Sequence, residues 1–357
     1  MQQVLIRCTN WIGDAVMSLA ALRELRRLES KAHLTLVARE WVAPIFAGQG
    51  IADHLVTLEN RSLGLSRLFR KGRQLRGFDT AVLLQNAFGA ALLALIAGIP
   101  NRIGYTTDNR RFLLTRGAKP RTNHLGRHQI FYYLDLLFQA GISPVDYLNT
   151  PSFQPDISLT PSRECLEAAD SLLHDMGADR SKPLVAVNPG ATFGSAKRWF
   201  PQRYGEVSDR LISEIGAEIL LIGSTSERSI AEEIQAGMRH SPCSLVGLTQ
   251  LSTLIGVLAR CQLFVGNDSG PMHLAAALGI PQVAIFGSTD EVATGPFNQK
   301  AVVIHKHVEC SPCLLRECPI DLRCFNRIHP DEVYETARQV LKKYAHPRDP
   351  RHHDTIN

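Results

Sequence analysis

The chain alternates short apolar runs of strand length with longer amphipathic runs of helix length. In its first half, strand-like runs lie at 2–8, 32–38 and 80–85, and a helix-like run at 15–28 joins the first two. Parallel neighbours in a sheet need a long crossover connection, which is usually a helix. The pattern therefore predicts an α/β fold in which a parallel sheet is covered by helices.

The same alternation begins again in the second half of the chain. Strand-like runs lie at 183–190, 217–224, 262–268 and 282–288. Before them, segment 146–182 contains several prolines and polar residues, as expected for a linker that leads into an opening helix. We predict two domains, which also suits a length of 357 residues at roughly 150 residues per domain.

The expected domain boundaries follow from this division. A final run has Val333, Ala337 and Leu341 at helical spacing and precedes a polar tail. We expect a first α/β domain over 1–160, a second over 161–329, a helix over 330–345 and a disordered tail over 346–357.

Composition and charge restrict the classes of function. With 45% hydrophobic and 20% charged residues, the chain has an ordinary globular composition. Its net charge of +5 is too small to suggest nucleic-acid binding, but it weakly favours phosphates or an acidic membrane surface as partners. The N-terminus MQQVLIRCTNWIGD has no signal-peptide features, so we expect a cytosolic protein.

The most apolar segment, 87–99, is too short to span a bilayer. A buried helix is one interpretation of it, and a surface that touches a membrane is the other. Neither interpretation predicts a membrane span.

Eight cysteines are present, and four of them lie close together in CSPCLLRECPIDLRC. In a cytosolic protein such a grouping suggests metal or redox chemistry more than structural disulfides. The spacing fits no common zinc pattern well, and a structural zinc site needs four ligands that close into a tetrahedron. We predict no bound metal and keep as the alternative a metal cluster on Cys310, Cys313, Cys318 and Cys324.

Polar and turn-forming residues follow the strand-like run 262–268, which ends at Asp268. Ser269, Gly270 and Pro271 come next, before an apolar helical run. Proline suits the first helical turn, and the backbone N–H groups of that turn form a natural phosphate site. Asp268 either belongs to such a site or only caps the helix.

A second loop of matching character, NPGATFGSAKRWFP (188–201), follows the strand-like run that begins at 183. Its small residues allow close approach of a ligand, and Lys197 supplies a positive charge for an anion. The loop lacks the Gly-Lys-Ser/Thr ending of a P-loop, and no G-x-G-x-x-G follows the first strand. We therefore expect neither ATP hydrolysis nor a nicotinamide cofactor.

Asp14 follows the first strand-like run, within TNWIGDAVMS. It is either a helix cap or a general base, provided that it comes within hydrogen-bond reach of a substrate hydroxyl. The same half of the chain is rich in basic residues, which form a solvated face or bind an anionic acceptor. These residues are Arg61, Arg67, Arg70, Lys71, Arg73, Arg76, Arg102, Arg110 and Arg111.

Three motifs together, WIGD, PGATFGSAKRW and NDSGPMHLAAALGIP, resemble the ADP-heptose:lipopolysaccharide heptosyltransferases of glycosyltransferase family 9. The resemblance includes 83–105 and covers most of 1–345. It implies a GT-B architecture, with two Rossmann-like domains facing across a cleft and the last helix crossing back to the first domain. It also implies inverting transfer without a metal or cofactor, which agrees with the lack of a D-x-D pair.

The resemblance also implies roles for individual residues. Asp14 is expected to be the general base, and Lys197 to stabilise the charge on departing ADP. Phe193 stands where some relatives carry a small hydroxyl residue. The expected donor-binding residues are Thr192, Lys197, Glu227, Thr249, Asp268, Ser269, Gly270 and His273, and the expected acceptor-binding residues are Asn86, Arg67, Arg70, Lys71 and Arg110.

The activity implied is transfer of L-glycero-D-manno-heptose from ADP-heptose to the first heptose of heptosyl-Kdo2-lipid A, a lipid A core acceptor. We expect it at the cytosolic face of the inner membrane, with peripheral membrane contact and no nucleic-acid partner. Three alternatives remain: a family 9 enzyme with another donor or acceptor, a non-catalytic nucleotide-sugar-binding protein, and a nucleotide-sugar epimerase.

Overall fold

The computed structural model describes residues 1–59, 65–121 and 126–344. Arg61 and the expected tail over 346–357 lie outside the described residues. The chain divides into two compact units, the first built mainly on Met1–Ala169 and the second mainly on the residues from Asp170 onward. The division falls inside a helix, nine residues after the boundary expected at 160.

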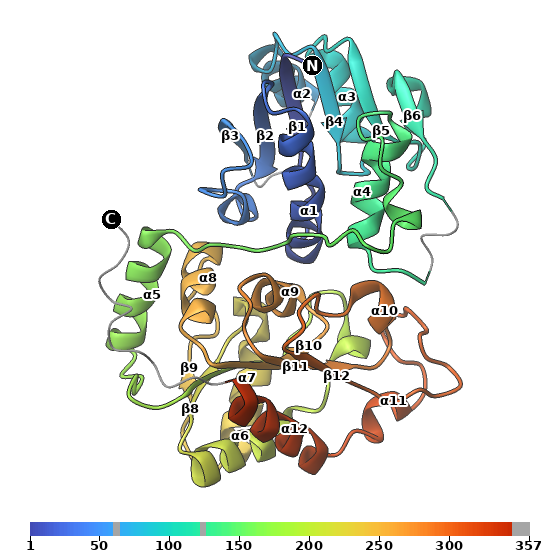
Figure 1. The fold of residues 1–357 in the computed structure, drawn as a ribbon. Helices are drawn as coiled ribbons and strands as arrows, with labels where there is room; N and C mark the ends of the chain where they lie inside the picture. The colour runs from blue at the N-terminus through green and yellow to red at the C-terminus, as the bar shows by residue number, and fades with distance from the viewer. Residues whose placement is uncertain (60–64, 122–125, 345–357) are drawn as a thin grey trace. The chain divides into compact units, whose positions relative to one another are not determined.

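The first unit contains a parallel sheet with strand order β3-β2-β1-β4-β5-β6 within the described ranges. Helix α1 packs against α4, and α2 packs against α3 (Figure 1). The strands are β1 (Gln3–Arg7), β2 (His33–Arg39), β3 (His54–Leu58), β4 (Thr80–Leu83), β5 (Asn101–Tyr105) and β6 (Arg116–Ala118). The helices are α1 (Ile12–Leu28), α2 (Leu65–Gln74), α3 (Phe88–Ile96) and α4 (Ile130–Gln139), with 3-10 turns at η1 (Ala43–Ile45), η2 (Arg111–Leu113) and η4 (Tyr147–Asn149).

The second unit repeats this plan with strand order β12-β11-β10-β7-β8-β9. Helices α6, α7 and α12 lie on one face of the sheet, and α8 and α9 lie on the other (Figure 1). The strands are β7 (Leu184–Asn188), β8 (Glu218–Leu221), β9 (Cys243–Ser244), β10 (Leu263–Asn267), β11 (Gln282–Phe286) and β12 (Ala301–His305). The helices from residue 163 onward are α5 (Arg163–Asp175), α6 (Pro201–Ile215), α7 (Arg228–Gly237), α8 (Leu251–Ala259), α9 (Gly270–Ala277), α10 (Glu291–Thr294), α11 (Arg323–Asn326) and α12 (Pro330–Tyr344), with 3-10 turns at η5 (Ser195–Lys197) and η6 (Thr225–Glu227). Of these, α10 and the first parts of α5 and α8 are counted with the first unit.

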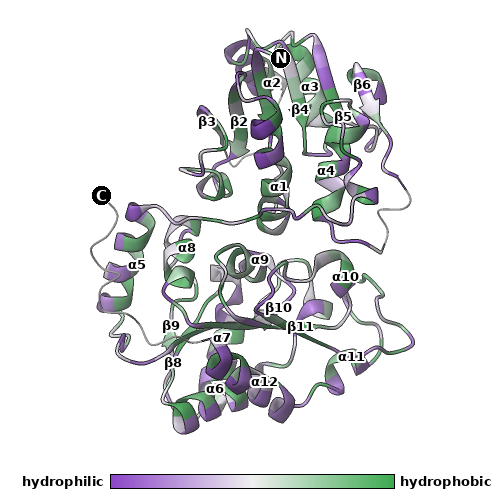
Figure 2. Ribbon diagram, in the orientation of Figure 1, coloured by the Kyte–Doolittle hydropathy of each residue, from purple (hydrophilic) through white to green (hydrophobic). Residues whose placement is uncertain are grey.

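The central strands are apolar because helices cover both faces of each sheet. Every residue of β7, β10 and β11 is buried, and Figure 2 colours β10 and β11 as hydrophobic. Strands buried on both faces lose the alternation of apolar and polar residues and become continuous apolar runs. The predicted α/β fold with parallel sheets is therefore confirmed in both units.

Each sheet has a switch point, where the chain begins to wind in the opposite direction. In the first sheet the chain adds β2 and β3 on one side of β1, and then adds β4, β5 and β6 on the other. In the second sheet β7 and β10 are the corresponding neighbours. Ligands of open α/β sheets bind outside the carboxyl ends of the strands at this point. The fold therefore identifies candidate site residues in each unit: the loop after β1 in the first unit, and the loops after β7 and β10 in the second.

The expectation that the final helix crosses back to the first domain is wrong. The apolar side chains of α12, including Val333, Tyr334 and Leu341, are buried in the core of the second unit. Helix α12 contacts α6 and strands β10, β11 and β12, and its ribbon in Figure 2 carries both hydrophilic and hydrophobic residues, as in a helix with one buried face. The amphipathic pattern correctly predicted a packed helix, but it could not identify the sheet on which the helix packs.

The apolar segment 87–99 forms α3, a helix with two kinds of surface. Ala91 and Leu93 are buried in the core of the first unit, whereas Phe88 and Leu95 are 39% and 42% exposed. Among the described helices, none combines the length and the apolar character needed to cross a membrane.

Candidate functional site

Two buried asparagines, which the sequence analysis did not identify, join the loops after β7 and β10. Asn267 ends β10, donates from Nδ2 to the carbonyl of Pro189 at 2.7 Å and accepts at Oδ1 from the backbone N–H of Trp199 at 3.0 Å. Asn188 ends β7 and accepts at Oδ1 from the hydroxyl of Ser269 at 2.7 Å. Buried amides are stable when their hydrogen bonds are made, so this pair fixes the two loops to each other.

Lys197 and Asp268 form an ion pair between these loops. Lys197 Nζ lies 2.6 Å from Asp268 Oδ2, and the two side chains are only 15% and 4% exposed. Thr289 donates to the same carboxylate oxygen at 2.7 Å, and His273 Nε2 lies 3.9 Å from the other oxygen. A buried carboxylate is stable only when it is paired, so Asp268 holds the lysine in place. The fold thus brings three predicted donor-binding residues together.

Helix α9 begins at this ion pair. Its N-cap residue is Ser269, whose side chain makes no cap hydrogen bond, and its first helical residues are Gly270 and Pro271. Asp268 therefore precedes the cap, and the alternative that it only caps the helix is wrong. The first turn offers backbone N–H groups and the positive end of the helix dipole, which stabilise an anion.

The loop that carries Lys197 packs against the cysteine-rich segment. The backbone N–H of Ala196 donates to the carbonyl of Arg316 at 3.0 Å, and a Cβ at Gly194 would overlap that same carbonyl. The ring of Phe193 lies 5.1 Å from Lys197 Nζ and 5.3 Å from the guanidinium carbon of Arg316, within cation–π range. The cysteine grouping suggested metal or redox chemistry, whereas in the structure this segment supports the lysine loop.

Glu227 lies at the carboxyl end of β8 and contacts the loop after β7. Its Oε2 accepts from the backbone N–H and the hydroxyl of Ser224 at 2.7 and 2.8 Å, in a capping box. A Cβ at Gly190 would overlap the Glu227 carboxylate, so only glycine allows this approach. Thr192 is exposed on the same loop, and Thr249 is half-buried between β9 and α8.

Asp14 lies in the first turn of α1, just after β1. The N-cap residue of this helix is Trp11, so the alternative that Asp14 is the N-cap is wrong. The hydroxyl of Tyr133, from α4, donates to Asp14 Oδ1 at 2.7 Å. The carboxylate is half-buried and is held by a neighbouring helix, as a base that must keep one orientation would be.

The guanidinium of Arg110 is buried and is not presented to an acceptor substrate, contrary to our expectation. It is 0% exposed, and its donors bond to the carbonyls of Tyr105, Gln85 and Ala87 and, at 3.0 Å, to Asn86 Oδ1. Burial lowers its pKa. Arg110 therefore supports the loop after β4, and Asn86 is the residue of this pair that lies nearer the surface.

The other predicted acceptor-binding residues lie on α2. Arg67 and Arg70 are exposed and Lys71 is half-exposed. Phe69, 52% exposed, forms with Arg70, Arg73 and Gln74 a pocket of about 440 Å³. The helix thus combines several positive charges with an apolar surface.

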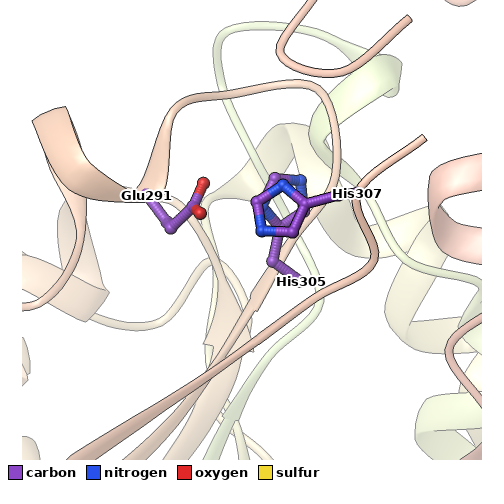
Figure 3. Close-up of side chains that lie close together, drawn as sticks. All are labelled: Glu291, His305 and His307. Carbon is purple, nitrogen blue, oxygen red and sulfur yellow. The ribbon is translucent and has the colours of Figure 1, made fainter. Parts of the chain in front are cut away.

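Two groups of metal-ligand residues lie outside these loops. The four clustered cysteines are free thiols, and burial raises the pKa of Cys324. A different group of three residues has its ligand atoms within 4.8 Å of one another within the described ranges. This group is Glu291, His305 and His307 (Figure 3). The four cysteines do not meet this distance criterion, and metal binding by them stays the alternative to our prediction of no bound metal.

Comparison with known proteins identifies the family. A family model described as glycosyltransferase family 9 (heptosyltransferase) matches residues 67–323. The chain belongs to glycosyltransferase family 9. It is 32% identical to lipooligosaccharide heptosyltransferase 2 of Haemophilus ducreyi over 85% of this chain and 88% of the relative. It is 31% identical to lipopolysaccharide heptosyltransferase 2 of Salmonella typhimurium over 85% of this chain and 87% of the relative.

A solved structure supports the same membership of family 9. The structure of ADP-heptose LPS heptosyltransferase II from E. coli matches with a TM-score of 0.82 and 26% identity, covering 97% of this chain and all of that one. The chain is therefore a glycosyltransferase, and its two Rossmann-like units are those of a GT-B heptosyltransferase.

Each unit offers one kind of group at the carboxyl ends of its strands. The second unit holds a cation beside a helix N-terminus, which suits an anion, and the first unit holds a half-buried carboxylate, which suits a proton or a hydroxyl. Sequence reasoning found these residues but missed Tyr133, Asn188 and Asn267. The only sequence signal for the asparagines is a polar residue at the end of an otherwise apolar strand.

Proposed function

We propose that this family 9 glycosyltransferase moves L-glycero-D-manno-heptose from ADP-heptose to the first heptose of heptosyl-Kdo2-lipid A. The observation that carries the proposal is the Lys197–Asp268 pair beside the start of α9, at the switch point of the second sheet. The names of relatives that match 85% of the chain support heptose transfer to a lipopolysaccharide or lipooligosaccharide acceptor, and the E. coli enzyme with a similar structure is named for ADP-heptose.

The proposed reaction is a single displacement. Asp14 accepts the proton of the attacking acceptor hydroxyl, and the hydroxyl oxygen forms a bond to the anomeric carbon of the donor heptose. The bond from that carbon to the diphosphate oxygen breaks, and ADP leaves with the electron pair. Attack from the face opposite the leaving group inverts the anomeric centre.

Stabilisation of the leaving ADP comes from groups that are already in place. Lys197 is held by Asp268, and the first turn of α9 directs N–H groups to the same end of the sheet. Donors fixed before the reaction stabilise developing charge without reorganisation. Ser269 and Gly270 would contact the diphosphate together with Thr192, while Asp268 would hold heptose hydroxyls and His273 would lie beside the phosphates.

The nucleoside is proposed to bind along the β8 side of the same sheet. Glu227 contacts the loop after β7 and would hold the ribose, with Thr249 near the adenine. Ser224 donates two hydrogen bonds to Glu227 Oε2. We therefore propose that Glu227 Oε1 accepts from the ribose hydroxyl.

The acceptor is proposed to bind the first unit through Asn86 and the exposed cations of α2. A lipid A core is amphiphilic and phosphorylated, and α2 offers Arg67, Arg70 and Lys71 beside the exposed Phe69. The same combination suits peripheral contact with an anionic membrane. We therefore place the enzyme at the cytosolic face of the inner membrane.

The test is ADP release from ADP-heptose by purified protein in EDTA, with heptosyl-Kdo2-lipid A, with Kdo2-lipid A or without acceptor. We expect release that depends on the heptosylated acceptor and survives EDTA. Equal ADP release with Kdo2-lipid A would mean that the proposed acceptor is wrong. No ADP release with either acceptor would exclude this function. If EDTA abolishes ADP release and a divalent metal restores it, the metal-independent mechanism is contradicted.

Asp14→Asn tests the base in the same assay. We expect turnover to fall by at least about 10²-fold while ADP-heptose binding is kept, because only proton removal is lost. Binding is measured by calorimetry. Wild-type turnover in this variant would refute the mechanism and would leave Asp14 with a structural role.

A further inference from the structure

The hydroxyl of Tyr133 is a buried polar group that the proposed reaction does not use. Tyr133 lies in the first turn of α4 and is 4% exposed, and its hydroxyl donates to Asp14 Oδ1 at 2.7 Å. Helix α4 packs along α1, which carries Asp14. A hydrogen bond from a hydroxyl to a carboxylate belongs to the stronger, charge-assisted class.

The proton of this hydrogen bond stays on the tyrosine. Burial raises the pKa of Tyr133 well above its usual value, and the charge of Asp14 raises it further. The nearby Gln129 side chain acts in the opposite direction, as a smaller effect. The hydroxyl keeps its proton and directs it to Asp14 Oδ1.

The surroundings hold the tyrosine itself in place. Tyr132, the neighbouring residue, stacks edge-on against Tyr133 at 5.5 Å between ring centroids. The backbone carbonyl of Tyr132 accepts a hydrogen bond from the hydroxyl of Tyr105 at 2.8 Å. The hydroxyl of Tyr132 accepts one from Asn86 at 2.7 Å. The first turn of α4 is thus tied to β5 and to the loop after β4.

We propose that Tyr133 is a positioning residue that orients the Asp14 carboxylate for removal of the acceptor proton. The inference rests on the proposed function, in which Asp14 is the base. An aspartate in a half-exposed helical turn can adopt several rotamers, and a fixed donor on one oxygen selects one of them. Tyr133 thereby sets the direction in which the carboxylate meets the acceptor hydroxyl.

Tyr133→Phe removes the hydroxyl and keeps the ring. We expect kcat to fall about tenfold, which corresponds to one lost hydrogen bond to a charged group, with both KM values unchanged. We also expect the acid limb of the kcat–pH profile to move to higher pH, because the carboxylate loses a donor that favours its charged form. A wild-type kcat with a wild-type pH profile would overturn the proposal.

Tyr147→Phe is the matched control. Its hydroxyl is also buried in the first unit, where it bonds to Glu24 at 2.7 Å and to Ser143 at 2.6 Å, away from Asp14. We expect this variant to lose stability without a change in the pH profile. A shift of the profile in Tyr147→Phe equal to that in Tyr133→Phe would mean a general structural effect and would overturn the proposal.

Asp14→Asn separates failure of this inference from failure of the proposed function. If Asp14→Asn is inactive while Tyr133→Phe behaves as wild type, only the positioning role is refuted. If Asp14→Asn keeps full turnover, the base assignment fails, and the inference fails with it. Should Tyr133→Phe not fold, Tyr133→Met also removes the hydroxyl, and a wild-type kcat with a wild-type pH profile in that variant would overturn the proposal.

Discussion

Lys197 forms a buried ion pair and also has a proposed chemical role. Replacing it with Met removes the cation beside the proposed diphosphate and leaves Asp268 buried without its partner. We expect kcat to fall by about 10²–10³-fold, as for loss of one pre-placed stabilising group. We also expect the free energy of unfolding to fall by about 3 kcal/mol, because an unpaired carboxylate is costly. Initial rates and urea unfolding measure the two effects.

A double variant separates the two roles of Lys197. Lys197→Met combined with Asp268→Asn removes both charges, so we expect the free energy of unfolding to recover while activity stays low. Recovery of turnover together with stability would show that the lysine only neutralises Asp268. Thr289, which also donates to this carboxylate, is kept in every variant.

Residues of the candidate site could be predicted from the sequence where they follow a strand. Asp14, Lys197 and Asp268 are polar residues at the ends of apolar runs, and parallel strands place such ends at ligand sites. Tyr133 could not be found in this way, because an aromatic residue in an amphipathic helix is usually part of the core. Its partner is 119 positions away in the sequence, and only the packing of α4 on α1 brings them together.

At the scale of elements, apolar runs identified the buried strands but not their order. β7, β10 and β11 are continuous apolar runs, so they were evident. The order within a sheet depends on which strands form hydrogen bonds, and local pattern carries no such information. The packing of α12 on the second sheet escaped prediction for the same reason, since a helix with one apolar face can pack on either sheet.

Helix α2 gives a prediction about the acceptor. Reversing two exposed charges, with Arg70→Glu and Arg73→Glu, should raise KM for heptosyl-Kdo2-lipid A about tenfold and leave kcat at saturation nearly unchanged. The reason is loss of attraction for a phosphorylated acceptor, so the effect should shrink at high salt. Initial rates at low and high ionic strength measure it.

The control for α2 is an equal change of charge elsewhere. Lys342→Glu and Lys343→Glu reverse two exposed charges in the last turn of α12, in the second unit. This variant should keep the wild-type KM for the acceptor. Equal changes in KM for the two variants would point to net charge rather than to α2 as the cause.

At the scale of the whole molecule, acid stability depends on ion pairs between distant segments. Arg121 bonds to Asp146 at 2.9 Å, and this bond lowers the pKa of the carboxyl to about 2. A lowered pKa contributes stability above the ordinary pKa of aspartate, and the contribution is lost as the pH falls towards 2. Arg121 also pairs with the buried Asp135 on α4.

We therefore expect the free energy of unfolding of Asp146→Asn at pH 7 to be lower than that of the wild type by about 0.5–1 kcal/mol. The effect is small because the Arg121–Asp146 pair is partly exposed to solvent. The difference should narrow below pH 4 and disappear near pH 2. Urea unfolding of both proteins at pH 7, 4 and 2.5 measures this difference in the free energy of unfolding. A difference that is the same at all three values would assign the effect to packing or to the neutral hydrogen bond to Asn149.

The close contact between Gly194 and Arg316 has a consequence for redesign of the enzyme. Any side chain at position 194 would displace the backbone that carries the lysine, so a library aimed at new nucleotide sugars should keep this glycine. Phe193 beside it is 41% exposed, and its ring lies within cation–π distance of two cations. Position 193 can therefore be varied while the backbone around it is retained, which makes it the natural first choice for laboratory evolution of donor preference.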